Sequence, residues 1–244
     1  MDQAHALMQS LFDRYVQRTG DAAEAYMLQH ARPSVIARQI QSCRMYLPHV
    51  SGRTLDWGCH HAPDSCLIRH FKGAEPELYG CDAPGADYAS FVDFFDYAGV
   101  RFTELAHPYQ LPYGDGFFDT VVSSGVLEHA PNDYESIKEI HRVLKSGGHF
   151  VITFLPNRYS YTEALSRWLG RSHHERTYAL GDITRRLRHA GFRVLDARYF
   201  LMVPTILPGA ERLWGLNPLL ERLWPINRLS SNLLIVAQKR DFMQ

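Results

Sequence analysis

The feature that most constrains the fold is a series of short apolar runs that alternates with helix-compatible stretches. The runs cover residues 53–57, 77–81, 100–105, 120–123, 148–154, 192–199 and 232–238. Helical patterns lie between several of them, notably at 134–144, where two glycines follow, and at 180–190. Strands that alternate with helices form a mostly parallel, doubly wound sheet. We therefore expect an α/β fold in which residues 1–244 form a single domain.

Two parts of the chain lie outside this alternation. Residues 1–50 have two helical stripes and predict a helical cover, with Pro33 in the first turn of the second helix. We assign 51–199 to the core, 200–229 to an apolar insert, and 230–244 to a final strand and tail. The insert is rich in Leu, Trp and Pro. It is interpreted as extra core, as a lid over an apolar or lipid-linked acceptor, or as a surface that contacts a membrane.

Composition limits the classes of partner and compartment. Lys plus Arg and Asp plus Glu both number 26, so the formal net charge is zero and no overall field would attract nucleic acid. The longest apolar run, 199–210, holds two prolines and is far shorter than the roughly 20 residues of a membrane-spanning helix. The four cysteines lack CxxC pairing and no signal-like segment is visible, which favours a cytoplasmic protein.

The turns after the first two strands suggest a nucleoside site. Asp56 and Gly58 lie at the first turn, where a doubly wound sheet binds ligands, and Asp82 ends the second strand about 20 residues later, where a carboxylate can accept from ribose hydroxyls. Gly58 is the only glycine in this first turn, whereas a dinucleotide loop requires G-x-G-x-x-G. Nicotinamide or flavin binding is therefore disfavoured. A strand that ends in Asp is by itself more often a cap or a loop carboxylate.

Five motifs in order make the interpretation specific. They are Leu-Asp-Trp-Gly-Cys at 55–59, Tyr-Gly-Cys-Asp at 79–82, Leu-Pro-Tyr-Gly-Asp-Gly-Phe-Phe-Asp at 111–119, Val-Leu-Glu-His at 126–129, and Glu-Ile-His-Arg-Val-Leu-Lys-Ser-Gly-Gly at 139–148. Over about 54–156 the chain resembles the class I, Rossmann-like S-adenosylmethionine-dependent methyltransferases, in particular the ubiquinone and menaquinone methyltransferase group. The resemblance implies a seven-stranded sheet whose last strand is antiparallel, and S-adenosyl-L-methionine as the cofactor.

The resemblance also implies roles for particular residues. Asp56 organises the first turn and reaches the methionine amine, directly or through water, and Asp82 takes the ribose hydroxyls. Backbone groups of the turn would bind the amino-acid part, other residues would lie beside the adenine or beneath the sulfonium, and further residues would lie near the acceptor. These three sets are Gly58 and Cys59; Ala83, His107, Pro108, Ser123 and Ser124; and His173, His174 and Tyr178.

His129, just after the fourth strand, is the candidate general base, because an imidazole suits proton removal from a hydroxyl acceptor near neutral pH. The alternative is that its ring only fixes the loop by hydrogen bonding. Metal binding by His173 with His174, or by Cys59, His60, His61 and Cys66, matches no familiar spacing, so we expect no metal. Methyl transfer to a small molecule, with oxygen the expected acceptor atom, follows from the resemblance. Nitrogen and carbon stay open as acceptor atoms, as do the identity of the acceptor and the oligomeric state.

Departures from the family pattern support a second hypothesis. His60 and Ala62 stand where relatives usually have glycines, and His107 stands where they usually have an acid that accepts from the adenine amino group. A neutral imidazole can accept that hydrogen bond through one nitrogen. The rival hypothesis is a methyltransferase-like binding or scaffold subunit that lacks catalysis.

Overall fold

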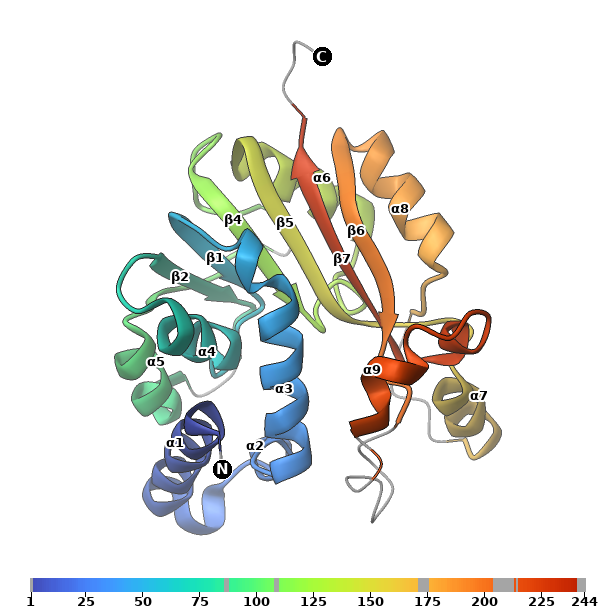
Figure 1. Cartoon of the computed structure of the whole chain (residues 1–244). Helices are drawn as coiled ribbons and strands as arrows, with labels where there is room; N and C mark the ends of the chain where they lie inside the picture. Colours follow the sequence, from blue (N-terminus) through green and yellow to red (C-terminus); the bar gives the residue numbers. More distant parts are fainter. Residues whose placement is uncertain are drawn as a thin grey trace. The chain divides into compact units, whose positions relative to one another are not determined.

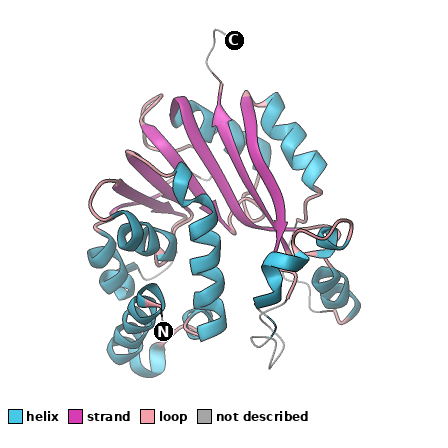
Figure 2. Ribbon diagram, viewed as in Figure 1, coloured by secondary structure: helices cyan, strands magenta, loops and turns pink. Residues whose placement is uncertain are grey.

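The computed structural model describes residues 2–85, 88–107, 110–170, 176–203, 213 and 215–240. It divides into two compact units, Met1–His107 and Pro108–Gln244. Across the chain seven strands form one sheet in the order β3-β2-β1-β4-β5-β7-β6. This order and the mixed strand directions confirm the expected α/β methyltransferase-type fold (Figures 1 and 2).

The first unit combines a parallel sheet with a set of helices. Its strands β1, β2 and β3 pair in parallel, with Leu55 opposite Tyr79 and Tyr79 opposite Arg101. Its elements, in chain order, are α1 Gln3–Thr19, η1 Gly20–Ala22, α2 Ala25–His30, α3 Pro33–Tyr46, η2 Leu47–His49, β1 Arg53–Trp57, α4 Pro63–Lys72, β2 Glu77–Asp82, η3 Tyr88–Phe91, α5 Val92–Ala98 and β3 Arg101–Glu104.

The helical cover expected at 1–50 is present as α1, α2 and α3. Asp2 caps α1 through a hydrogen bond from the Ala4 amide, and Pro33 begins α3. The helix α1 buries one face, formed by Met8, Leu11, Phe12 and Tyr15, and it packs against α3, α4 and α5. These helices therefore belong to the core of the first unit.

The second unit carries the antiparallel part of the sheet. Strand β5 pairs in parallel with β4 and antiparallel with β7, and β7 pairs antiparallel with β6, as the resemblance implied for the last strand. Its elements are β4 Phe118–Ser124, α6 Asp133–Val143, β5 Leu144–Pro156, α7 Tyr161–Trp168, α8 Leu180–His189, β6 Phe192–Phe200, α9 Asn217–Leu220, η5 Ile226–Leu229 and β7 Asn232–Lys239.

The glycines after α6 do not end that helix, contrary to the sequence interpretation. Helix α6 ends at Val143, and Gly147 and Gly148 lie inside β5, at a shift in its register with β4. Gly147 has a φ of 76°, and a Cβ on Gly148 would come within 2.9 Å of the Lys145 carbonyl oxygen. Both positions therefore require glycine for a bulge in the strand rather than for a helix end.

The described part of the insert is tied to the sheet at its ends but exposes most of its large apolar side chains. Leu201 and Val203 are buried, and their amides donate to Glu221 and Asn217 respectively. The exposed set is Leu213, Leu216, Leu219, Leu223, Trp224, Ile226 and Leu229. These residues therefore do not form the extra core that was one interpretation of the insert.

No helix in the described part of the chain has both the length and the apolar character needed to cross a bilayer.

Candidate functional site

The turn between β1 and α4 adopts left-handed backbone at alternate residues. Gly58, His60 and Ala62 have φ values of 72°, 47° and 54°. Glycine adopts this region freely, whereas a residue with a Cβ there costs roughly 1–2 kcal/mol. Hydrogen bonds offset part of the cost: the His60 amide donates to Asp82 Oδ2 at 2.7 Å, and the Ala62 amide donates to the Cys59 carbonyl at 2.6 Å. The backbone of the turn is therefore held in the left-handed conformation at both non-glycine positions, His60 and Ala62.

Asp82 lies at the end of β2, against this turn. Its Oδ2 accepts from the His60 amide and its Oδ1 accepts from the Ala83 amide, each at 2.7 Å. A carboxylate has about four acceptor sites, so both oxygens keep capacity for further donors. The side chain is half-buried rather than enclosed. A partly exposed, fixed carboxylate at this strand end has the chemistry needed to accept from the two hydroxyls of a ribose.

Asp56 faces the first turn of α4. It is 3% exposed, and its Oδ2 accepts from the Ser65 hydroxyl at 2.7 Å and from the Ser65 amide at 3.2 Å. Burial, followed by the charge of nearby Asp64, raises the pKa of Asp56 to about 8. Asp64 is itself buried and accepts from Gln39 and Tyr46. These contacts show that Asp56 joins β1 to α4 and so organises the first turn.

The amides of Gly58 and Cys59 are already used. Both donate to the Cys81 carbonyl, at 2.8 and 3.2 Å, which ties the turn to the end of β2. The backbone that these two residues can offer to a ligand is therefore their carbonyl oxygens, which accept hydrogen bonds from an ammonium group.

Histidines and aromatic rings form one side of the turn, which the sequence interpretation did not anticipate. The His60 ring centroid lies 4.7 Å from that of Phe91 and 4.8 Å from that of Tyr26. His61 is buried, and its Nδ1 lies 3.1 Å from Nδ1 of His60. Burial lowers the pKa of both imidazoles, so they are neutral near pH 7.

These groups do not form a metal site. Burial raises the pKa of the Cys59 and Cys66 thiols well above the usual range, which disfavours the thiolate that binds metal. Among the residues that the structure describes, no three His, Cys, Asp or Glu side chains are arranged to hold a metal ion. His173 and His174 lie outside the described residues.

The two candidates for adenine contact in the described part of this unit are exposed. Ala83 follows Asp82 directly, and its carbonyl accepts from the Tyr88 hydroxyl. His107 is exposed at the end of the first unit. Pro108 lies outside the described residues.

In the second unit, Ser123 and Ser124 end β4. Ser123 is fully buried, and within the described chain its Oγ has no hydrogen-bond partner, whereas Ser124 is half-buried. A buried hydroxyl without a partner costs free energy unless water or a ligand binds it. Ser123 is therefore a candidate ligand contact in this unit.

His129 lies on the loop between β4 and α6, and 54% of its side chain is exposed. Its Nε2 is 4.0 Å from Oε1 of the buried Glu128. The loop is braced by other residues: the Tyr178 hydroxyl donates to the Leu127 carbonyl at 3.3 Å, and Arg176 donates to the Ala130 and Pro131 carbonyls. The imidazole of His129 is thus exposed on a loop that Tyr178 and Arg176 also brace.

Tyr178 was predicted to lie near the acceptor, but its described contacts are structural. Its ring is buried, and its hydroxyl donates to Asp133 Oδ2 at 3.1 Å as well as to Leu127. Asp133 also accepts from Arg186 at 2.7 Å. Burial, followed by the charge of Asp133, raises the pKa of the Tyr178 phenol, so it stays neutral. Tyr178 therefore connects the loop to the start of α6.

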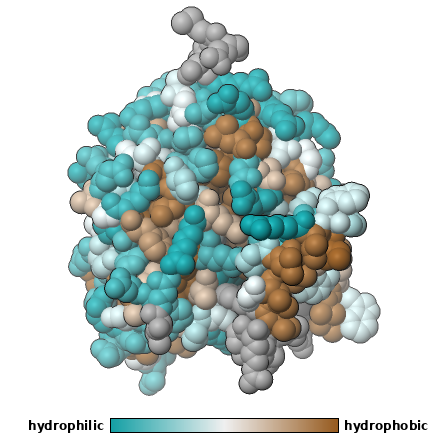
Figure 3. All heavy atoms as spheres, viewed as in Figure 1, coloured by the Kyte–Doolittle hydropathy of each residue, from teal (hydrophilic) through white to brown (hydrophobic). Residues whose placement is uncertain are grey.

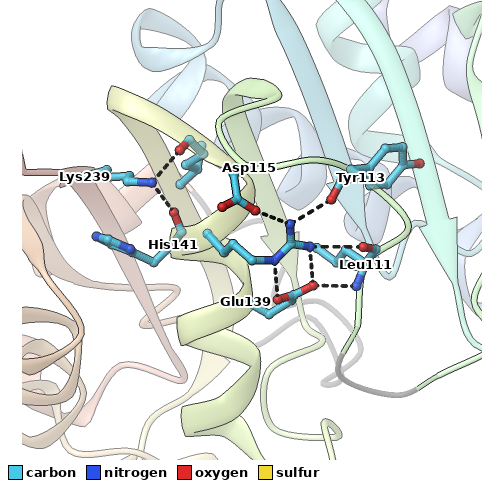
Figure 4. Close-up of polar contacts among 8 residues, drawn as sticks. Leu111, Tyr113, Asp115, Glu139, His141 and Lys239 are labelled. Atoms are coloured by element: carbon cyan, nitrogen blue, oxygen red, sulfur yellow. Dashed lines mark hydrogen bonds and ion pairs between the residues drawn. The ribbon is translucent and has the colours of Figure 1, made fainter.

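Arg142 joins two of the sequence motifs through a network of hydrogen bonds (Figure 4). Its guanidinium donates to both carboxylate oxygens of Glu139, at 2.6 and 2.8 Å, and to Asp115 at 2.7 Å. It also donates to the carbonyls of Leu111 and Tyr113, and the Leu111 amide donates back to Glu139. These residues hold the segment before β4 against α6. This part of the motif set therefore stabilises the folded structure.

We expect Arg142→Ala to lower the free energy of unfolding by about 2 kcal/mol, because it removes several charged hydrogen bonds from a partly exposed site. For a chain of this size that corresponds to a melting temperature lower by roughly 4–8 °C, measured by differential scanning calorimetry. Lys138→Ala on the same helix is the matched control, because Lys138 forms an exposed ion pair with Glu135, and it should shift melting by less than about 2 °C. Equal shifts for both variants would contradict the role assigned to Arg142.

The central part of the chain is similar in sequence to known methyltransferases. Residues 56–152 match the family model described as a methyltransferase domain. A probable S-adenosylmethionine-dependent methyltransferase of Mycolicibacterium smegmatis is 33% identical over 142 residues, which is 58% of this chain and 52% of that protein. The arsenite methyltransferase of Aquipseudomonas alcaligenes is 28% identical over 133 residues, 50% of this chain and 38% of that protein. The chain thus spans about half the length, or less, of these curated relatives.

Solved structures agree on the fold. An S-adenosylmethionine-dependent methyltransferase from Thermotoga maritima aligns with a TM-score of 0.65 and 16% identity, over 95% of this chain and 99% of that one. At this identity the likeness concerns the fold alone.

Proposed function

We propose that the protein is a class I S-adenosylmethionine-dependent methyltransferase that transfers a methyl group to an oxygen atom of a small-molecule acceptor, and the family-model match over residues 56–152 supports this. The observation that carries this proposal is the Asp82 carboxylate, fixed by the His60 and Ala83 amides at the end of β2. The chemistry that S-adenosyl-L-methionine supplies when bound is an electrophilic methyl group on a sulfonium.

Residues of the first unit would hold this cofactor. Asp82 would accept from the ribose hydroxyls, and the carbonyl oxygens of Gly58 and Cys59 would accept from the methionine ammonium, with Asp56 supporting the turn. Ala83 would lie beside the adenine, where a neutral imidazole of His107 would accept from the adenine amino group, and Pro108, the first residue of the second unit, would adjoin it in sequence.

The second unit would supply the remaining groups. Ser123 and Ser124 would lie beneath the sulfonium, and the partnerless Ser123 hydroxyl in the described chain supports this assignment. His129 would remove the proton from the acceptor hydroxyl as the methyl group is transferred, which is worth typically 10²–10⁴-fold in rate. Most of the remaining rate would come from holding the acceptor in line with the methyl carbon, worth up to about 7–11 kcal/mol.

S-adenosylhomocysteine binding tests the proposal. A ligand at about 100 times its dissociation constant adds roughly 2.7 kcal/mol of stability, or about 5–10 °C in melting temperature for a chain of this size. We expect this shift with S-adenosylhomocysteine, measured by thermal unfolding, and none with NAD at equal concentration.

Two other results would contradict this expectation in different ways. A folded sample that shows no shift with millimolar S-adenosylhomocysteine would favour the binding or scaffold subunit that lacks catalysis. A shift with NAD alone would indicate a nicotinamide enzyme.

A further inference from the structure

Two segments of the second unit expose an unusual concentration of large apolar side chains. Trp168 on α7 and Trp224 beside η5 are 81% and 76% exposed, although tryptophan is usually well covered. The other members, each 42–58% exposed, are Tyr159, Leu165, Leu169, Leu213, Leu216, Leu219, Leu223, Ile226 and Leu229. Figure 3 shows a hydrophobic area where Figure 1 places α7 and α9. We call the described residues of 158–169 and 213–229 the apolar-basic surface.

The apolar side chains form faces rather than scattered points. Leu165, Trp168 and Leu169 are three and four residues apart, so they share one face of α7 and its last turn. Leu216 and Leu219 are three residues apart at α9, and Leu223 lies in the turn that follows this helix. Contiguous exposed apolar faces of this kind mark an interaction site.

The exposed charges on the apolar-basic surface are all of one sign within the described residues. Arg158, Arg167, Arg222 and Arg228 are exposed, and of these Arg158 pairs with Asp182. The two acids of the same segments are turned inward: Glu163 is 7% exposed, and Glu221 accepts from the Leu201 amide. The surface therefore combines exposed Trp and Leu with net positive charge.

Hydrogen bonds join the first segment, at residues 157–162, to the end of the second, at residues 228–231. Asn157 donates to the carbonyls of Arg228 and Ser230, at 2.8 and 2.7 Å, and the Thr162 and Ser231 hydroxyls lie 3.0 Å apart. The Arg228 guanidinium lies 5.7 Å from the centre of the Tyr159 ring. The apolar side chains are thus carried on a defined frame.

We propose that the apolar-basic surface docks on a lipid bilayer that contains anionic headgroups, with Trp168 and Trp224 inserted at the interface. Tryptophan and leucine beside arginine is the composition of elements that lie in the plane of a membrane surface. Each basic side chain near an anionic surface adds attraction that salt weakens. A symmetric contact with a second copy would bring arginines of both copies together, and the described acids here are turned inward, so self-association is disfavoured.

The experiment is flotation of the full chain with vesicles, and it is independent of methyl transfer because its readout is binding alone. We expect binding to an equal mixture of phosphatidylglycerol and phosphatidylcholine, weaker binding to phosphatidylcholine alone, and release by high salt. The double variant Trp168→Ala with Trp224→Ala should bind the mixed vesicles at least tenfold more weakly, with unchanged melting because both rings are exposed. Arg222→Gln should weaken binding to the mixed vesicles only.

Matched controls lie on the same unit, outside the surface. Leu195 on β6 is 41% exposed and Arg185 on α8 has 67% of its side chain exposed, so Leu195→Ala and Arg185→Gln should bind vesicles as the unchanged chain does. Brominated lipid should quench the tryptophan fluorescence of the unchanged chain, and it should quench that of the double variant much less. The inference fails if neither vesicle is bound, if Leu195→Ala weakens binding as much as the double variant, or if the tryptophans instead prove necessary for dimers in sedimentation velocity.

Discussion

Replacing Asp82 with alanine is expected to weaken binding of S-adenosylhomocysteine by at least tenfold, and by about a hundredfold where both ribose contacts depend on it. Hydrogen bonds to a charged group contribute about 1.5–3 kcal/mol, and each 1.4 kcal/mol is a factor of ten in affinity. Isothermal titration calorimetry with S-adenosylhomocysteine measures the change directly.

The structure adds a stability effect to this prediction. Because Asp82 also accepts from the His60 and Ala83 amides, its removal leaves a left-handed His60 without its carboxylate partner. We therefore expect the empty Asp82→Ala protein to melt about 2–8 °C lower. Asp82→Asn keeps one carbonyl acceptor for the turn, so it should melt closer to the unchanged protein while still binding the ligand weakly.

Glu104 provides the matched control for Asp82. It lies opposite Asp82 in the β2–β3 pairing, at the same end of the sheet, and it is exposed. Glu104→Ala should leave both affinity and melting nearly unchanged. Unaltered affinity in Asp82→Asn, or an equal loss in Glu104→Ala, would remove Asp82 from the ribose site.

The fold was largely predictable because its sheet obeys simple patterning. All seven predicted runs became strands. In β7 the residues 233–237 are continuously apolar and buried, as a strand with two covered faces requires, whereas β6 mixes polar and apolar residues and is mostly exposed or half-buried. The role predicted for the two glycines after α6 was wrong, because glycine signals both a helix end and a strand bulge, and only the pairing of β5 with β4 distinguishes them. The local sequence does not show which residues of β4 and β5 pair.

The site was predictable in part, for a related reason. Asp56 and Asp82 lie at strand ends, so their places follow from the sheet. The left-handed backbone of His60 and Ala62 does not follow from residue type, because both residues prefer other conformations and are held by distant partners. Likewise, the contact of Tyr178 with Leu127 spans 51 residues, so no local pattern predicts it.

The network around Arg142 shows how one motif can serve two purposes. The segment at 111–119 and the helix motif at 139–148 carry part of the family resemblance, yet Glu139, Arg142 and Asp115 bind one another and the backbone. Their contacts fix the residues that precede β4, which then carries Ser123, Ser124 and the loop with His129. Motif residues of this kind affect chemistry only by positioning, so their variants should lose stability first.

His129→Ala is expected to lower the rate of methyl transfer by about 10²–10⁴-fold while S-adenosylhomocysteine binds with unchanged affinity. The physical reason is that proton removal from a hydroxyl acceptor loses its base, whereas the residues of the first turn that would hold the cofactor are unchanged. The measurement is transfer of tritiated methyl from S-adenosylmethionine into the organic-extractable fraction of a deproteinised cell extract.

Free imidazole distinguishes a base from a structural residue at this position. Added imidazole should restore part of the activity of His129→Ala, because a small base can replace the missing side chain, and it should not restore Arg142→Ala, whose defect is in folding. His189→Ala is the matched control, since His189 is also exposed on the second unit, at the end of α8, and it should transfer methyl groups normally. Normal turnover in His129→Ala, or a loss that imidazole leaves unchanged and that parallels a lower melting temperature, would show that the ring only supports the loop.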